Sequence, residues 1–306
     1  MCVFLFFLLT AFGEETKIED VYLLRVDQAA TLGDRVLLAY HAPGVLPKTM
    51  LINMETETAR DIVDQRIAAA MPILTPFGDG FAMISRFGTQ YFFLLDINGQ
   101  FLERLEPDQF DGWEEGLTLK RVYALSDGNL FCNLVSLRRK LDFVAILSPE
   151  KRALTIVHQE PTVTITQESA MTFSRRWVPG GDVVYLLTLE PGRIELLDPQ
   201  TFQPVRTLYP GHHLIKRDPA KFKVLAKRRP YASRMGDPII FGNEIAMSFF
   251  RDVDRFGEPL TPATEVGMHI DAEGRLHEGN TLYLSRFGKK ILGFNISEKS
   301  LFVKKD

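Results

Sequence analysis

The tetrapeptide Ser-Arg-Phe-Gly occurs twice in this chain, with a similar frame around each copy. One copy lies in FGDGFAMISRFGTQYFFLLDINGQFLERL (residues 77–105), and the other lies 200 residues later in EGNTLYLSRFGKKILGFNISEKSLFV (residues 278–303). In each stretch a glycine precedes an alternating apolar run, and a second apolar run ends at a polar turn. Two similar frames so far apart indicate that the chain is built from internal repeats.

The same frame occurs six times when it is anchored on a glycine turn that precedes an alternating apolar segment. The anchors are Gly33, Gly78, Gly128, Gly181, Gly242 and Gly279. Glycine beside Asp or Asn favours a tight hairpin, because these residues tolerate positive φ. Each unit therefore reads as four strands joined by a glycine turn, a loop and a polar turn. This pattern predicts antiparallel meanders of about 45–55 residues, the size of one blade of a β-propeller.

The spacing of the anchors predicts which units are regular. Successive anchors lie 45, 50, 53, 61 and 37 residues apart. The last two intervals together span about two units, so we expect an insertion in the fifth unit and a compact sixth one. On this alignment the two Ser-Arg-Phe-Gly copies mark the same loop in units two and six. A lone meander cannot bury both of its faces, so the units must stack around an axis; five or seven blades are the alternatives to six.

The units resemble those of six-bladed β-propellers of the NHL/TolB-like type, which are common among exported bacterial proteins. The segments that carry the resemblance are 127–135 (DGNLFCNLV), 279–286 (GNTLYLSR) and 94–105 (LLDINGQFLERL). The resemblance spans Val21 to Val303 and implies an all-β ring of six four-stranded antiparallel blades. It also implies that the strand at Asp20–Val26 joins the last blade, which closes the ring and protects its open edge. Propellers host enzymes, scaffolds and ligand sensors, so no activity follows from this likeness.

The N-terminal residues resemble a secretion signal. The first 13 residues, MCVFLFFLLTAFG, form an apolar run too short to span a bilayer, and they end in the small-x-small pattern of a signal-peptidase site. We therefore expect a signal peptide at 1–13, a single propeller domain at 14–306 and a secreted or periplasmic location. No Lys or Arg precedes the apolar run, so the alternatives are a missed upstream start or a buried strand. No later stretch is long and apolar enough for a membrane span.

Composition limits the remaining functions. The chain has 306 residues, of which 45% are apolar and 25% are charged, as in globular proteins. A net charge of −3 argues against binding nucleic acid over the whole surface. The two cysteines, Cys2 and Cys132, cannot make a disulfide framework or a four-ligand zinc site, and Cys132 is expected to be buried and inert. His212 and His213 have no further ligands at useful spacing, so neither a metal nor a cofactor is expected.

Arginine recurs in the loops that follow the second strand of each unit. These loops share one rim with the connections between units, and their basic residues are His41, Arg86, Arg138, Arg139, Arg193, Arg251, Arg255 and Arg286. Guanidinium groups around one channel mouth would suit a carboxylate, a phosphate or an acidic peptide. The alternative is that exposed loops carry arginine for solubility and that the repeated Arg-Phe-Gly sequence shapes its loops.

A second basic feature lies at 211–237, which holds eight Lys or Arg residues. Asp218 and Pro219 predict the start of a short inserted helix that runs to the basic cluster Lys227, Arg228 and Arg229. The segment is either a basic lid beside the rim or a solvated connector. A nucleic-acid role is not expected, because no aromatic residues are interleaved with the basic run.

No motif for a nucleophile, a phosphate-binding loop or a dinucleotide is present. The leading hypothesis is therefore a non-catalytic propeller that binds an anionic small molecule, a glycan or a peptide at the arginine-bearing rim, with its partner unidentified. The alternative is a propeller hydrolase or lyase that acts on a lactone, glycan or peptide. Its catalytic residues would converge at the channel mouth, and the side chains to inspect are His41, Glu115, Asp252 and Asp254.

Overall fold

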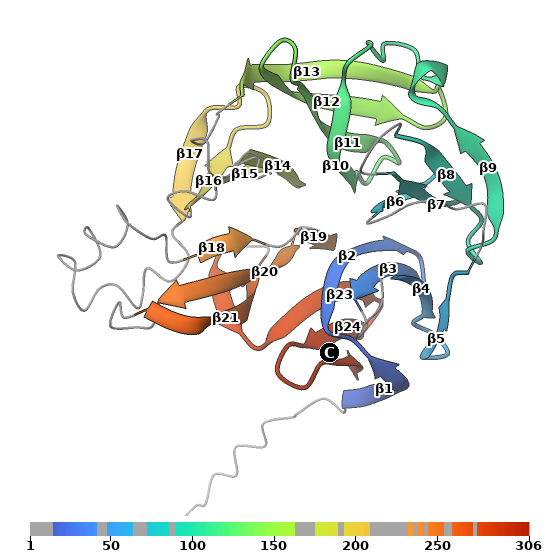
Figure 1. Cartoon of the computed structure of the whole chain (residues 1–306), viewed down its shortest axis with the longest axis vertical. Helices are drawn as coiled ribbons and strands as arrows, with labels where there is room; N and C mark the ends of the chain where they lie inside the picture. Colours follow the sequence, from blue (N-terminus) through green and yellow to red (C-terminus); the bar gives the residue numbers. More distant parts are fainter. Residues whose placement is uncertain are drawn as a thin grey trace, which may run out of the picture.

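Six antiparallel sheets stand around a common centre in the computed structural model (Figure 1). The structure describes residues 15–41, 48–63, 72–85, 90–162, 175–188, 193–208, 232–235, 238–241, 244–253, 259–271 and 274–305, with only the backbone for some strand residues. The expected signal peptide at 1–13, the expected helix from Asp218 to Arg229 and the insertion of the fifth unit lie outside these residues. Within the described residues no helix is long and apolar enough to cross a membrane.

The first four sheets are meanders whose strands follow one another in the chain. The first and second sheets contain β2 (Arg25–Leu32), β3 (Arg35–His41), β4 (Lys48–Asn53) and β5 (Thr58–Asp61), then β6 (Ile73–Phe77), β7 (Gly80–Ile84), β8 (Phe92–Leu95) and β9 (Phe101–Leu105). The third and fourth contain β10 (Thr118–Ala124), β11 (Leu130–Ser136), β12 (Leu141–Ser148) and β13 (Ala153–Pro161), then β14 (Arg175–Gly180), β15 (Val183–Thr188), β16 (Arg193–Leu197) and β17 (Pro204–Leu208).

The fifth sheet differs because its first strand is in two pieces. Its strands are β18 (Ala232–Met235), β19 (Ile239–Phe241), β20 (Glu244–Val253), β21 (Pro259–Ile270) and β22 (Leu276–Gly279). Both β18 and β19 pair with β20, so together they form one interrupted edge. The expected fold, a propeller of six four-stranded blades, is confirmed.

The N-terminal strand closes the ring as expected. The sixth sheet contains β23 (Thr281–Phe287), β24 (Lys290–Asn295), β25 (Ser300–Lys305) and β1 (Glu15–Tyr22), and β1 pairs antiparallel with β25 (Figure 1). The closing strand begins earlier than the expected Asp20–Val26, because Arg25 and Val26 already belong to β2. This pairing covers the edge of β25, which would otherwise present unpaired peptide groups.

Two details of the expected repeat are wrong in the sixth blade. The glycine that turns its first hairpin is Gly288, with a positive φ of 56°, like Gly33, Gly78 and Gly181 in their blades. Gly279 instead ends β22 in the fifth blade. The interval from Gly242 to Gly288 is 46 residues, so the sixth unit is of ordinary length.

The two Ser-Arg-Phe-Gly copies consequently do not mark the same loop. Ser85 directly follows β7, the second strand of its blade, whereas Ser285, Arg286 and Phe287 end β23, the first strand of the sixth sheet along the chain. Ser285 is fully buried and accepts a hydrogen bond from Thr31 of the first blade at 2.9 Å. In the second copy the serine therefore joins two blades.

The core lies between neighbouring sheets rather than within any one of them. One cluster joins Leu37 of the first blade to Phe81 of the second, and another joins Phe92 of the second to Cys132 of the third. Cys132 is fully buried, as expected, and burial raises the pKa of its thiol. Because each blade is covered on both faces, its strands carry long apolar runs.

Buried carboxamide side chains connect consecutive blades. Gln28 accepts a hydrogen bond from Leu74 N at 2.8 Å, and Gln90 both donates to and accepts from the backbone of Leu119. Asn133 donates to the carbonyl of Trp177 and accepts from its N–H, both at 2.8 Å. In each case the partner lies in the first strand of the next blade. These side chains satisfy peptide groups that the sheet leaves unpaired.

We predict that Asn133→Ala lowers the free energy of unfolding by about 2–4 kcal/mol, because both polar groups of the buried Trp177 peptide lose their partner. Urea unfolding followed by tryptophan fluorescence measures the change. Asn98→Ala is the matched control, since Asn98 is exposed in the turn between β8 and β9. Equal effects of the two substitutions would contradict this role of Asn133.

Candidate functional site

A polar cleft lies between the fifth and sixth blades, with a volume of about 520 Å³. Strands β20, β21, β22 and β23 form its walls. Only Asn280 separates the end of β22 from the start of β23, and this residue forms a bend that lines the cleft.

Glycine at position 267 allows β21 to approach the start of β23. A Cβ atom on Gly267 would lie 2.2 Å from the carbonyl oxygen of Thr281, which is far inside any real contact. A Cβ on Gly279, which also lines the cleft, would meet nothing within 4 Å. The close approach at Gly267 therefore sets the spacing of two cleft walls.

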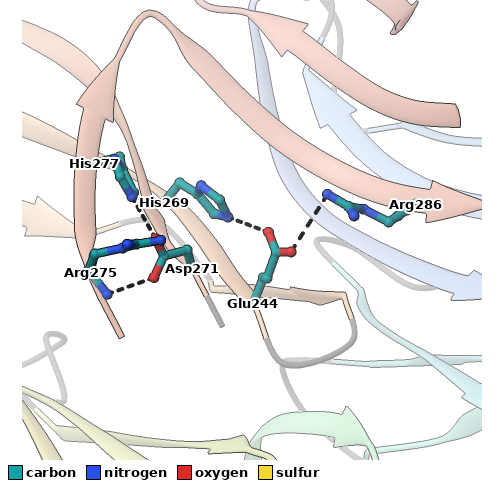
Figure 2. A network of polar contacts seen from close by, with 6 residues as sticks. All are labelled: Glu244, His269, Asp271, Arg275, His277 and Arg286. Atoms are coloured by element: carbon teal, nitrogen blue, oxygen red, sulfur yellow. Dashed lines mark hydrogen bonds and ion pairs between the residues drawn. The ribbon is translucent and has the colours of Figure 1, made fainter. Parts of the chain in front are cut away.

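The first polar group of the cleft centres on Glu244, at the start of β20. One carboxylate oxygen lies 2.6 Å from Nε2 of His269 in β21. The other lies 3.6 Å from a terminal nitrogen of Arg286 in β23, an ion pair that is longer than a hydrogen bond (Figure 2). The ring of Tyr283 meets His269 edge-on, with 5.2 Å between centroids. Glu244 thus joins the two blades that flank the cleft.

The second polar group centres on Asp271, just after β21. Its carboxylate accepts hydrogen bonds from the backbone N–H of Arg275 at 2.8 Å and from Nε of the same residue at 2.8 Å. Nε2 of His277 lies 2.9 Å from the same carboxylate (Figure 2). Burial raises the pKa of Asp271, but the hydrogen bonds from His277 and Arg275 outweigh it, so the pKa lies well below the usual carboxyl range. Asp271 is therefore a carboxylate at neutral pH.

The two groups meet because β21 and β22 are paired. His269 and His277 are direct cross-strand partners, and their ring centroids lie 5.8 Å apart. In an antiparallel pair, residues directly opposite each other point to the same face. Two imidazoles, each with its own carboxylate partner, consequently stand side by side.

Two arginines and one histidine of the cleft are more exposed than the two acids that pair with them. The side chains of Arg275, His277 and Arg286 are 65%, 55% and 41% exposed, whereas Asp271 and Glu244 are 14% and 19% exposed. The acids lie beneath and orient the basic groups toward solvent. A ligand that enters from solvent therefore meets the side chains of Arg275, His277 and Arg286 before the carboxylates of Asp271 and Glu244. Among the described residues, no three His, Cys, Asp or Glu side chains are placed to bind a metal ion together.

A much smaller cavity, of about 70 Å³, lies among the first strands of several blades. Thr31, Thr75, Arg121 and Tyr123 are among the residues that line it. This volume is close to the liquid share of two waters, so this cavity is too small for a sugar or a peptide.

Among the basic residues that the sequence grouped on one rim, Arg286 ends the first strand of its blade instead of following the second. Arg286 lines the cleft, whereas Arg138 and Arg139 are exposed in the turn between β11 and β12, where Arg139 pairs with Glu114. His41 ends β3 and lies 2.7 Å from a carboxylate oxygen of Asp27. Arg193, Arg251 and Asp252 lie in strands of which only the backbone is described at these positions. Arg86, Asp254, Arg255, Lys227, Arg228 and Arg229 lie outside the described residues, and Glu115 is exposed in a loop.

Sequence reasoning missed most of the cleft residues, although one signal was available. The stretch HIDAEGRLH (269–277) alternates polar side chains with period two on both sides of a polar turn. Such alternation puts His269, Asp271, Arg275 and His277 on one face of a hairpin. The contact of Arg286 with Glu244 has no such signal, because the two residues belong to different blades.

We predict that Gly267→Ala destabilises the protein by about 1–3 kcal/mol, because the new methyl group meets the Thr281 carbonyl and pushes β21 and β23 apart. Gly279 lines the same cleft, and a Cβ at this position would lie in open space. The Gly279→Ala substitution should therefore leave the unfolding midpoint unchanged within experimental error. Thermal unfolding of both variants measures the difference. A Gly267→Ala protein as stable as the Gly279→Ala protein would refute the close approach.

The comparisons with known proteins concern the fold. No protein-family model and no curated protein matches the chain. A candidate exported protein from Bacteroides fragilis matches with 11% identity and a TM-score of 0.51, over 96% of this chain and 93% of that one. The gluconolactonase XC5397 from Xanthomonas campestris matches with 10% identity and a TM-score of 0.50, over 96% and 89%.

TolB from Acinetobacter baumannii matches with 12% identity and a TM-score of 0.49, and the match covers 89% of this chain and 64% of TolB. Identities this low concern architecture alone. Because its six blades form a closed ring, this chain is a six-bladed β-propeller, similar in fold to the Bacteroides and Xanthomonas proteins.

Proposed function

We propose that this protein is a binding propeller that takes a small anionic ligand in the cleft between the fifth and sixth blades. The observation that carries the proposal is the order of exposure, with Arg275, His277 and Arg286 toward solvent and Asp271 and Glu244 beneath them. Guanidinium groups recognise carboxylates and phosphates through forked hydrogen bonds. Among the expected rim residues whose side chains the structure describes, Arg286 alone lines this cleft.

The size of the cleft supports a small molecule. Its volume of about 520 Å³ falls inside the range of about 300–1,000 Å³ that is typical of ligand pockets. The acids also hold their partners in place before a ligand arrives, and such preorganisation reduces the entropy that binding must overcome. The proposal therefore needs no catalytic step.

We expect citrate, phosphate or hexuronates to bind in isothermal titration calorimetry, with affinity that falls as salt is raised. Arg286→Ala should weaken binding by about 10–100-fold, because it removes charge-assisted hydrogen bonds. Arg138→Ala is the matched control, since Arg138 is an exposed arginine of the expected rim outside the cleft. If Arg138→Ala abolished binding and Arg286→Ala still bound the ligand, the binding site would be on the rim and not in the cleft.

A hydrolase or lyase is the second candidate function, and the paired imidazoles favour it. His269 and His277 each have a carboxylate partner, which is the arrangement of a general base and the group that orients it. Turnover of a lactone, glycan or peptide that is abolished by His269→Asn and His277→Asn would establish catalysis. A stably bound ligand without turnover would leave the binding function.

We also propose that the protein is exported and that residues 1–13 are removed. The support is the apolar run and its small-x-small end. N-terminal sequencing of the protein from its native host should begin near Glu14. A cell-associated protein that retains residues 1–13 would contradict export.

A further inference from the structure

We infer that the ligand of the cleft is an acidic sugar, with a carboxylate that pairs with the cleft arginines and hydroxyl groups that meet the polar side chains around the bend between β22 and β23. This inference rests on the proposed binding of an anion. It adds a second recognition element to the cleft, one that has no role in binding charge alone.

That second element is a run of polar side chains beside the cations. Glu278, Asn280, Thr281 and Tyr283 all line the cleft around the bend. They contribute a carboxylate, a carboxamide, an alcohol and a phenol, which together offer both donors and acceptors of hydrogen bonds. Glu278 would repel a carboxylate placed beside it, so the part of the ligand that meets Glu278 should be a neutral polar group. Glu278 can accept a hydrogen bond from a hydroxyl group.

The aromatic ring of Tyr283 adds an amphipathic wall. This side chain is half-buried, and it meets His269 at an interplanar angle of 71°. A tyrosine presents an apolar ring and a polar tip, as the C–H and O–H groups of a sugar require. A bare inorganic anion would use neither part.

The volume of the cleft also suits a ligand larger than a phosphate or acetate ion. About 520 Å³ equals the liquid share of roughly 17 waters. One phosphate or acetate ion would leave most of this space to solvent, whereas one or two sugar rings would fill it. The combination of arginine side chains, neutral hydrogen-bonding side chains and this volume points to a hexuronate or a short acidic oligosaccharide.

Isothermal titration calorimetry on the full chain tests the inference with matched probes. D-glucuronate and D-galacturonate carry both elements, D-glucose lacks the carboxylate, and cyclohexanecarboxylate lacks the hydroxyls. We expect at least one hexuronate to bind 10-fold or more tightly than either partial probe. Asn280→Ala and Thr281→Val should weaken the hexuronate by about 5–10-fold and leave cyclohexanecarboxylate unchanged, while Arg286→Ala weakens both.

The outcomes separate this inference from the proposed function. If cyclohexanecarboxylate binds as tightly as both hexuronates, the acidic-sugar assignment fails and anion binding stands. If D-glucose binds as tightly as the hexuronates, the carboxylate has no role and the assignment fails as well. If no hexuronate, citrate or phosphate binds, the proposed function itself fails. Thermal unfolding of each variant shows that it is folded, and Asn280 should tolerate the change because its side chain is exposed.

Discussion

The pairing of β1 with β25 is the interaction on which the rest of the structure depends. A blade buries its apolar faces only when it has a neighbour on each side, so an open ring would expose the faces of its two end blades. The strand that starts at Glu15 completes the sheet that ends at Lys305 and joins the two ends of the chain. The sixth sheet also supplies β23, one wall of the polar cleft. Closure and the candidate site therefore share one sheet.

Polar side chains set how the blades meet, both in the core and at the cleft. Gln28, Gln90 and Asn133 satisfy backbone groups of the next blade, and each contact fixes one blade against its neighbour. Between the fifth and sixth blades, Glu244 holds His269 and also pairs with Arg286. Buried partners of this kind have a directional geometry that apolar packing lacks. The same chemistry that aligns the other blades is here open to solvent, where a ligand can use it.

Local patterns in the sequence predicted the fold well, because strands and hairpins are local features. Alternation with period two and glycine at positive φ identified most turns, and the closing strand was placed to within a few residues. The prediction that Gly279 turns the first hairpin of the sixth blade was wrong. The Gly-Asn sequence is typical of a hairpin turn, but here it lies at the bend between the fifth and sixth blades. The cleft was mostly missed, since Arg286 and Glu244 come together only when the fifth and sixth blades pack against each other. The alternation at 269–277 is visible in the sequence, and it identifies His269, Asp271, Arg275 and His277.

Disulfide trapping of ring closure tests the central claim most directly. Thr16 and Val303 are register partners, and opposite residues of antiparallel strands lie at Cα distances that a disulfide can bridge. In a Cys2→Ser background, Thr16→Cys with Val303→Cys should oxidise within one molecule and stabilise the fold by about 2–4 kcal/mol. Thr16→Cys with Val205→Cys, which places the second cysteine on the fourth blade, should not. A failure of the first pair to cross-link, or equal cross-linking of both pairs, would contradict the closed six-bladed ring.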